Sequence, residues 1–294
     1  MRNWGTWSQE QAPYQLAVPK WQRVATCCCS KTYTLVHWDM FPYRDENPTY
    51  LTPFVTVGII ILNALVWVVV QGAGTDPALA RSVCELGAIP GELLQTVPAG
   101  TEIPVGPGLH CQLTGEPAWY TVLSSMFLHG GWVHIIGNMW FLWVFGNNVE
   151  DSMGHWRYMG FYLLCGVLAA LAQIFASPGS PVPMVGASGA ISGIMGGYLV
   201  LYPRVRVHTL VFLGFFVTRI AVPAYFMLLY WAFLQFVSSV FSAGAGAGEG
   251  GVAFVAHLGG FVAGAALIRL FAKREFVARH RRPRIVVGSP LDRF

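Results

Sequence analysis

The chain contains a run of nineteen residues, from Tyr158 to Ala176, without a single charged side chain. An α-helix needs about 20 predominantly apolar residues to cross the hydrocarbon core of a bilayer. Comparable stretches recur along the chain, and only 11% of its residues are charged. A soluble domain carries about 25% charged residues, so this chain has too little charge to coat a water-exposed surface. An integral membrane protein is the class that the sequence indicates.

Six apolar stretches are predicted to form helical spans, which makes the expected fold an all-α membrane protein built as a six-helix bundle. They cover Phe54–Val70, His134–Asn147, Tyr158–Ala176, Ser188–Tyr202, Ile220–Phe241 and Gly251–Phe271. The second and fourth stretches are short for a full crossing. A short helix can still lie at membrane depth where its end is buried in protein or faces a water-filled cavity.

The placement of charge predicts the orientation of the chain. Of the eighteen Lys and Arg residues, only Arg81 lies in a segment that follows span one, three or five. Cytoplasmic segments carry the excess of Lys and Arg in membrane proteins. We therefore expect both termini on the cytoplasmic side and the first loop outside. The net charge of +4 then reflects topology rather than nucleic-acid binding, and membrane lipids are the partners expected for the basic tail.

The chain divides into three parts. Residues 1–39 show no convincing periodicity, and we expect a poorly ordered arm or a segment upstream of a natural start at Met40. Residues 40–272 form the transmembrane domain, with an enlarged outer loop at 71–119, and residues 273–294 form the cytoplasmic tail.

Two cysteines, Cys84 and Cys111, lie in the enlarged outer loop. A disulfide would persist there if the loop faces an oxidising compartment. Their pairing is a hypothesis, because the spacing of cysteines does not set their connectivity.

Ser188 is a polar residue at the start of a predicted span, in the stretch PMVGASGAISGIMGGY. Gly189, Gly193 and Gly197 repeat at the spacing of close helix packing, so one interpretation is a small residue in a helix contact. The other interpretation is a nucleophile. Ser188 follows the proline-broken segment SPGSPVPMVGA, so it should lie near a helix N-terminus, where free N–H groups could face a developing negative charge.

His257 is predicted to lie about six residues into the last span. Gly260 and Gly264 leave that helix nearly bare on one face, so it could press against the glycines of the fourth span. His257 is either a packing residue or a general base that removes the proton of Ser188. No acidic residue is expected at the same depth, so the pattern predicts a Ser–His dyad rather than a triad.

His134 and Asn138 are four residues apart, so they share one face of the second span. Each has a structural interpretation, as an interfacial histidine and as a helix–helix hydrogen bond. Together they are two side-chain donors that enter from the same side as Ser188. Donors aimed at a tetrahedral oxyanion are usually the largest contribution to acyl transfer.

Three motifs in this order, HGGWVHIIGNMWFLWVFGNNVED, GASGAISGIMGGY and AHLGGFVAG, resemble those of the rhomboid intramembrane serine proteases. The resemblance covers about residues 40–271. It implies a short central helix that starts at the catalytic serine, and hydrolysis of a peptide bond in or beside a transmembrane helix of another protein. Family members need no metal or organic cofactor, so none is expected.

The resemblance also implies roles for particular residues. Ser188 corresponds to the nucleophile and His257 to the general base, while His134, Asn138 and the Ser188 backbone N–H correspond to the oxyanion site. Glu150 corresponds to a glutamate that stabilises the inner end of the second span. Supporting positions are Gly186, Gly189, Ser192, Gly260 and Gly264. Residues 241–252 resemble a flexible cap over the site, and the fifth span resembles a lateral gate for substrate.

One departure concerns the ring of His257. Some family members stack a tyrosine on the histidine, and Ser192 occupies that position here. The ring must then be held by packing or by a hydroxyl, for which Ser192 is a candidate.

Two other classes compete with a protease. A non-catalytic rhomboid-like protein that escorts membrane clients would typically have lost the serine or the histidine, and both are present. A channel or transporter would show a polar pore lining or two similar halves, and neither is evident. A bacterial inner membrane is the expected location, because no organelle signal is convincing.

Overall fold

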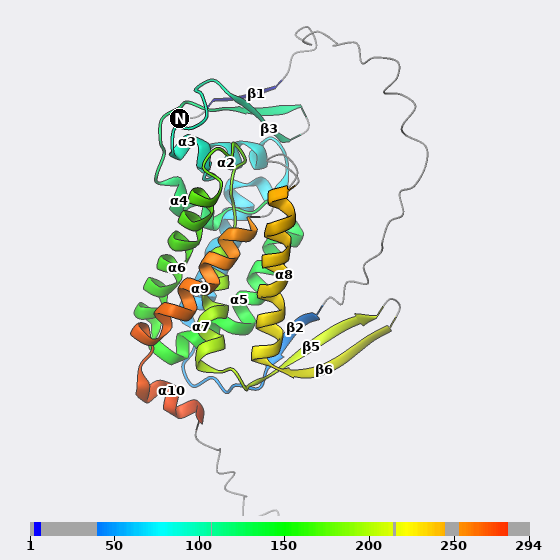
Figure 1. Ribbon diagram of the computed structural model, residues 1–294, viewed down its shortest axis with the longest axis vertical. Coiled ribbons are helices and arrows are strands. Elements are labelled where there is room, and N and C mark those ends of the chain that lie inside the picture. Colours follow the sequence, from blue (N-terminus) through cyan, green and yellow to red (C-terminus); the bar gives the residue numbers. More distant parts are fainter. Residues whose placement is uncertain (1–2, 7–39, 107, 214–215, 245–252, 282–294) are drawn as a thin grey trace, which may run out of the picture.

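The computed structural model describes residues 3–6, 40–106, 108–213, 216–244 and 253–281. Most of the predicted N-terminal arm, residues 245–252 of the predicted cap and residues 282–294 of the predicted tail lie outside these ranges. The described part is mostly helical, and its long helices run roughly along the longest axis of the molecule (Figure 1).

The helices are α1 (Phe54–Leu65), η3 (Val66–Val70), η4 (Gly72–Gly74), α2 (Ala78–Leu86), α3 (Pro90–Leu93), α4 (Thr121–Ser124), η5 (Ser125–Phe127), α5 (Trp132–Met153), α6 (His155–Ala176), α7 (Ser188–Leu201), α8 (Ala224–Gly244), α9 (Phe254–Phe271) and α10 (Arg274–Arg281). The strands are β1 (Asn3–Thr6), β2 (Met40–Asp45), β3 (Glu102–Gly106), β4 (Leu109–Gln112), β5 (Arg206–Leu213) and β6 (Phe216–Pro223).

Two helices in the described ranges, α6 and α9, are long and apolar enough to span a membrane. Shorter apolar helices occupy Phe54–Val70, Ser188–Leu201 and Ala224–Val240. The second predicted span, His134–Asn147, is part of the longer helix α5, which ends beyond the two acids Glu150 and Asp151.

The expectation of helices alone is incomplete, because the described strands form two three-stranded sheets at opposite ends of the bundle (Figure 1). One sheet has the order β2-β5-β6 and the other β1-β4-β3. The prediction that the fifth span starts at Ile220 is wrong, since residues 216–223 form β6 and helix α8 begins at Ala224. Val217, Thr218, Ile220 and Val222 favour an extended backbone, and Pro223 disfavours a helix at the residue before it.

Helix α7 lies in the middle of the bundle, where its residues from Gly189 to Tyr198 are all buried. It packs closely against α9. A Cβ atom added at Gly260 would collide with the carbonyl oxygen of Gly189, and one added at Gly264 would collide with that of Gly193. The two backbones therefore meet with no side chain between them, as small-residue faces allow.

Glu150 joins two helices at the end of the bundle that carries α10. Its buried carboxylate accepts hydrogen bonds from the backbone N–H groups of Val55 and Thr56, at 2.9 and 2.8 Å, and from the Thr56 hydroxyl. These N–H groups belong to the first turn of α1, where a helix has no internal partner for them. Glu150 thus fastens the C-terminal end of α5 to the start of α1, far from Ser188.

The loop of residues 71–119 folds into a small unit of its own at the other end. Cys84 and Cys111 form a disulfide there, and both are fully buried with Ile89, Ile103 and Leu113. Strand β1 pairs antiparallel with β4 of this unit. This position differs from the expectation that the whole N-terminal arm lies on the cytoplasmic side with the tail. The edge of β4 offers unpaired backbone groups, which β1 satisfies.

Candidate functional site

Helix α7 begins at Ser188, because the preceding segment cannot be helical. Pro178, Pro181 and Pro183 interrupt that segment, and Gly186 has a φ of +129°, a conformation that L side chains rarely adopt. Ser188 is therefore the first helical residue, and its N–H belongs to the set that has no acceptor within the helix. The sequence predicted this position from the prolines.

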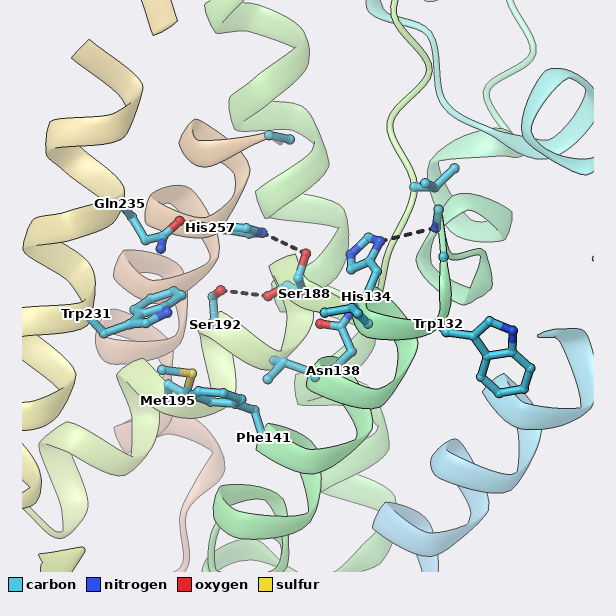
Figure 2. A pocket seen from close by; sticks show the side chains of 17 residues that line it. Trp132, His134, Asn138, Phe141, Ser188, Ser192, Met195, Trp231, Gln235 and His257 are labelled. Carbon is cyan, nitrogen blue, oxygen red and sulfur yellow. Dashed lines mark hydrogen bonds between the residues drawn. The ribbon is translucent and has the colours of Figure 1, made fainter. Parts of the chain in front are cut away.

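The hydroxyl of Ser188 lies 2.7 Å from Nε2 of His257 on α9 (Figure 2). The contact of α7 and α9 at Gly260 and Gly264 brings the two side chains together. The spacing of the glycines predicted the same approach. A hydroxyl and an imidazole at this distance can exchange a proton, which is the arrangement that activates a serine.

Gln235 on α8 completes this contact, and it is not among the residues predicted from the sequence. Its side-chain oxygen lies 2.8 Å from Nδ1 of His257. An amide oxygen only accepts, so Nδ1 carries the hydrogen and Nε2 is left to accept the proton of Ser188. The available signal was a lone amide within a predicted span, since polar residues at membrane depth are rare.

Trp231 lies on the same face of α8, one turn before Gln235. The centroid of its ring is 6.1 Å from that of His257, with an angle of 37° between the planes. Helix α8 therefore supplies both a hydrogen bond and a ring contact to His257 (Figure 2). Ser192 does not hold the ring, because its hydroxyl donates to the carbonyl of Ser188 at 2.6 Å.

His134 on α5 faces the same space. Its Nδ1 accepts a hydrogen bond of 3.2 Å from the backbone N–H of Gly130, so in the neutral ring Nε2 carries the hydrogen. A Cβ atom added at Gly186 would lie 2.9 Å from that Nε2. The ring thus occupies the space beside Gly186 and directs a donor toward the start of α7.

Asn138 lies one turn further along α5. Its Nδ2 is buried, and no acceptor for it is found among the described residues. Buried polar atoms nearly always have a partner, so an orphan donor needs an explanation. Asn138 and Ser188 both line one cavity, and the free donor of Asn138 is available to a group bound there.

The cavity has a volume of about 770 Å³ and lies between α5, α7, α8 and α9. The polar residues Ser188, His257, His134, Asn138, Gln235 and Ser192 line it, with apolar walls from Phe141, Met195 and Trp231. Gly189 lies behind the serine, where a Cβ atom would meet Ala169 of α6. Within the described ranges, no three His, Cys, Asp or Glu side chains are grouped so as to hold a metal ion.

Comparison with known proteins identifies the family. Residues 116–274 match the model of the rhomboid domain, which is more than half of the chain. The chain therefore belongs to the rhomboid family, whose members are embedded in membranes.

Three relatives illustrate the range of the family. The chain is 40% identical over 78 residues to the chloroplastic rhomboid-like protein 11 of Arabidopsis thaliana, covering 26% of this chain and 28% of that protein. It is 36% identical over 87 residues to the rhomboid protease GluP of Bacillus subtilis, covering 30% and 17%. It is 27% identical over 150 residues to the mitochondrial rhomboid protein 1 of Saccharomyces cerevisiae, covering 49% and 39%.

These matches span less than half the length of each relative. One is called a protease and another only rhomboid-like, and they come from a chloroplast, a bacterium and a mitochondrion. Family membership therefore does not determine whether this chain is a protease or in which membrane it lies.

Proposed function

We propose that this protein is an intramembrane serine endopeptidase that cleaves transmembrane helices of other membrane proteins near their extracytoplasmic end. The observation that carries the proposal is the 2.7 Å contact between Ser188 Oγ and His257 Nε2. A serine and a histidine with purely structural roles would not require a hydrogen bond to each other at the wall of an open cavity. The presence of proteases among the relatives supports the same activity.

The chemistry follows from the positions of the side chains. Ser188 Oγ attacks the scissile carbonyl carbon while its proton passes to His257 Nε2. The carbonyl oxygen becomes an oxyanion, toward which His134 Nε2–H, Asn138 Nδ2–H and the Ser188 N–H are available as donors. The tetrahedral centre collapses, the bond to the amine breaks, and His257 gives its proton to that amine. Water then attacks the acyl-serine with His257 as base again, which releases the carboxylate and restores the hydroxyl.

Water is a reactant in the second half of the reaction, so a site within a membrane needs a hydrated cavity. The cavity between α5, α7, α8 and α9 provides the room and the polar lining. We propose that α1, α5, α6, α7, α8 and α9 form the six-helix membrane bundle, with residues 71–119 outside and the basic tail inside. Substrate then enters sideways past α8 and unwinds locally, because an intact helix shields the scissile amide.

A serine-directed covalent probe tests the proposal. A fluorophosphonate should label the purified wild type in detergent and fail to label Ser188→Ala. Cleavage of a model transmembrane substrate should fall to background in Ser188→Ala and His257→Ala. Ser239→Ala is the matched control, since its hydroxyl only donates to the carbonyl of Phe236 one turn away on α8. Equal cleavage by wild type, Ser188→Ala and His257→Ala would refute the proposed protease activity. It would favour a rhomboid-like protein that binds membrane clients without cleaving them.

A further inference from the structure

The ring of His257 has two nitrogens, and only one of its two neutral tautomers can act as a base toward Ser188. In neutral histidine one nitrogen carries the hydrogen and the other accepts. A base toward Ser188 requires the hydrogen on Nδ1. In a serine triad a carboxylate holds this tautomer. Here Gln235 is the group that faces Nδ1, at 2.8 Å.

Among the residues that the structure describes, no other group near His257 would do this. Asp and Glu are absent from the residues that line the cavity among the described ranges, and the other titratable side chain there is His134 on α5. Helix α7 contributes Ser188, which is bound to Nε2. Helix α6 contributes Gln173, whose side-chain oxygen accepts from the backbone N–H of Ala256 at 3.2 Å and is thus engaged by α9. The proton on Nδ1 therefore depends on α8.

We propose that Gln235 is a positioning residue that fixes the Nδ1-protonated tautomer of His257, so that α8 must be packed against α9 for the base to work. This inference rests on the proposed function. Gln235 acts as a neutral counterpart of the carboxylate in a triad: it sets the tautomer and the orientation of the ring without adding a charge.

The position of Gln235 gives the inference a structural consequence. Ser188, His134 and Asn138 lie on α7 and α5, whereas the hydrogen bond to Nδ1 from Gln235 and the ring contact from Trp231 come from α8. Phe254 of α9 itself contacts the ring edge-on but offers no hydrogen-bond acceptor. A displacement of α8 would leave the serine and the oxyanion donors in place and release only the base. The ability of His257 to act as a base therefore depends on the position of α8. We propose that substrate enters past this same helix.

Two variants separate a specific hydrogen bond from a packing effect. Gln235→Leu removes the acceptor, and kcat should fall at least tenfold with a smaller change in KM, because the lost hydrogen bond is made to the base and not to substrate. Gln235→Glu keeps an acceptor at the same length, so most activity should return at high pH. Ser239→Ala on the same helix should match the wild type.

The pH profile of kcat provides a readout that packing alone would not move. A carboxylate beside Nδ1 stabilises the protonated ring. Since a base works only when neutral, the acidic limb of the profile should move to higher pH by about half a unit or more in Gln235→Glu. An unmoved limb, or a rate in Gln235→Leu equal to that of the wild type, would overturn the inference.

A measurement that needs no turnover separates this inference from the proposed function. The ¹⁵N chemical shifts of the His257 ring, assigned with His257→Ala, distinguish a protonated from an unprotonated nitrogen. We expect hydrogen on Nδ1 in the wild type and a mixture of tautomers in Gln235→Leu. If the wild type cleaves no substrate but the shifts differ between wild type and Gln235→Leu as expected, the proposed protease activity is refuted and the positioning role is supported. If the wild type cleaves and Gln235→Leu keeps the wild-type shifts, only the positioning role fails.

Discussion

Asn138 is a buried polar residue of the cavity whose side chain lacks a structural explanation. Its buried Nδ2 has no acceptor among the described residues, and a lone buried donor costs stability rather than adding it. Such a cost is often retained where a group serves a reaction. An oxyanion formed at Ser188 would give this donor its missing partner.

We therefore predict opposite effects of Asn138→Ala on activity and on stability. Turnover should fall by about one to three orders of magnitude, the scale of a lost oxyanion donor. The melting temperature should stay the same or rise, because an unpaired donor is removed. Steady-state kinetics and thermal unfolding in detergent check both. An unchanged kcat would mean that Asn138 is structural.

Asp45 is a second residue with a perturbed environment, at the other end of the molecule. Its carboxylate accepts from the Tyr198 hydroxyl at 2.5 Å and from the Asn148 amide at 2.7 Å. Burial nevertheless raises the pKa of the Asp45 carboxyl from 3.8 to about 6. The folded state thus holds this proton more tightly than the unfolded chain does.

The sign of the pH dependence follows. The stabilisation from protonated Asp45 is complete below about pH 4 and is lost as the pH rises through about 6. Asp45→Asn should remove this decline, so its melting temperature relative to wild type should rise by a few degrees between pH 4 and 7. Glu116→Gln, at an exposed carboxylate of the outer loop, is the control. A constant difference between wild type and Asp45→Asn across that range would contradict the assignment.

At the scale of elements, the contact between α7 and α9 decides whether the site exists. Gly264 faces the backbone of Gly193 with no room for a Cβ atom, and Gly260 faces that of Gly189. Ser188 begins the same α7 that these contacts place against α9. A change that separates the two helices should therefore lengthen the distance from Ser188 to His257.

Gly264→Val tests this dependence. Overpacking of a close contact typically costs 1–3 kcal/mol. We expect a lower melting temperature and a loss of probe labelling at Ser188, even though residue 264 does not line the cavity. Gly58→Val on α1 is the control, since nothing lies within 4 Å of a Cβ atom there. Equal labelling of Gly264→Val and wild type would show that the site tolerates separation of the helices.

The elements also show where sequence reasoning succeeds and fails. Long apolar runs such as Tyr158–Ala176 predicted a helix within a few residues, because burial in lipid and helix formation favour the same residues. The start of the fifth span was predicted wrongly. The apolar residues around Ile220 are compatible with a strand as well as with a helix, and they form β6. Hydrophobicity alone does not distinguish the two over so short a stretch.

At the scale of the whole molecule, the two ends differ in chemistry. The disulfide unit of residues 71–119 lies at one end, and the sheet of β2, β5 and β6 lies at the other, together with α10 (Figure 1). Ser188 lies at the end of α7 nearer the disulfide. If that end faces outward, the Cys84–Cys111 bond forms in an oxidising compartment.

This orientation predicts the behaviour of the disulfide in cells. The wild type should migrate differently on gels with and without reductant, and Cys84→Ser should lose the difference. A membrane-impermeant reductant added to intact cells or spheroplasts should open the bond. Closing a loop of this size is worth about 2–4 kcal/mol, so Cys84→Ser should also make residues 71–119 more sensitive to protease. A shift that survives Cys84→Ser, or a bond that resists the impermeant reductant, would contradict the prediction.

The sequence by itself determined the class of protein, the approximate positions of the helices and the candidate residues Ser188, His257, His134 and Asn138. These follow from local properties: apolar length, small residues at helical spacing, and polar groups where lipid makes them costly. Only the tertiary structure decided that Gln235 faces Nδ1 of His257, that Ser192 bonds to a backbone carbonyl instead, and that Nδ2 of Asn138 finds no acceptor among the described residues. Such contacts join residues from separate helices, and their distances depend on how the backbones pack, which no pattern along a single segment contains.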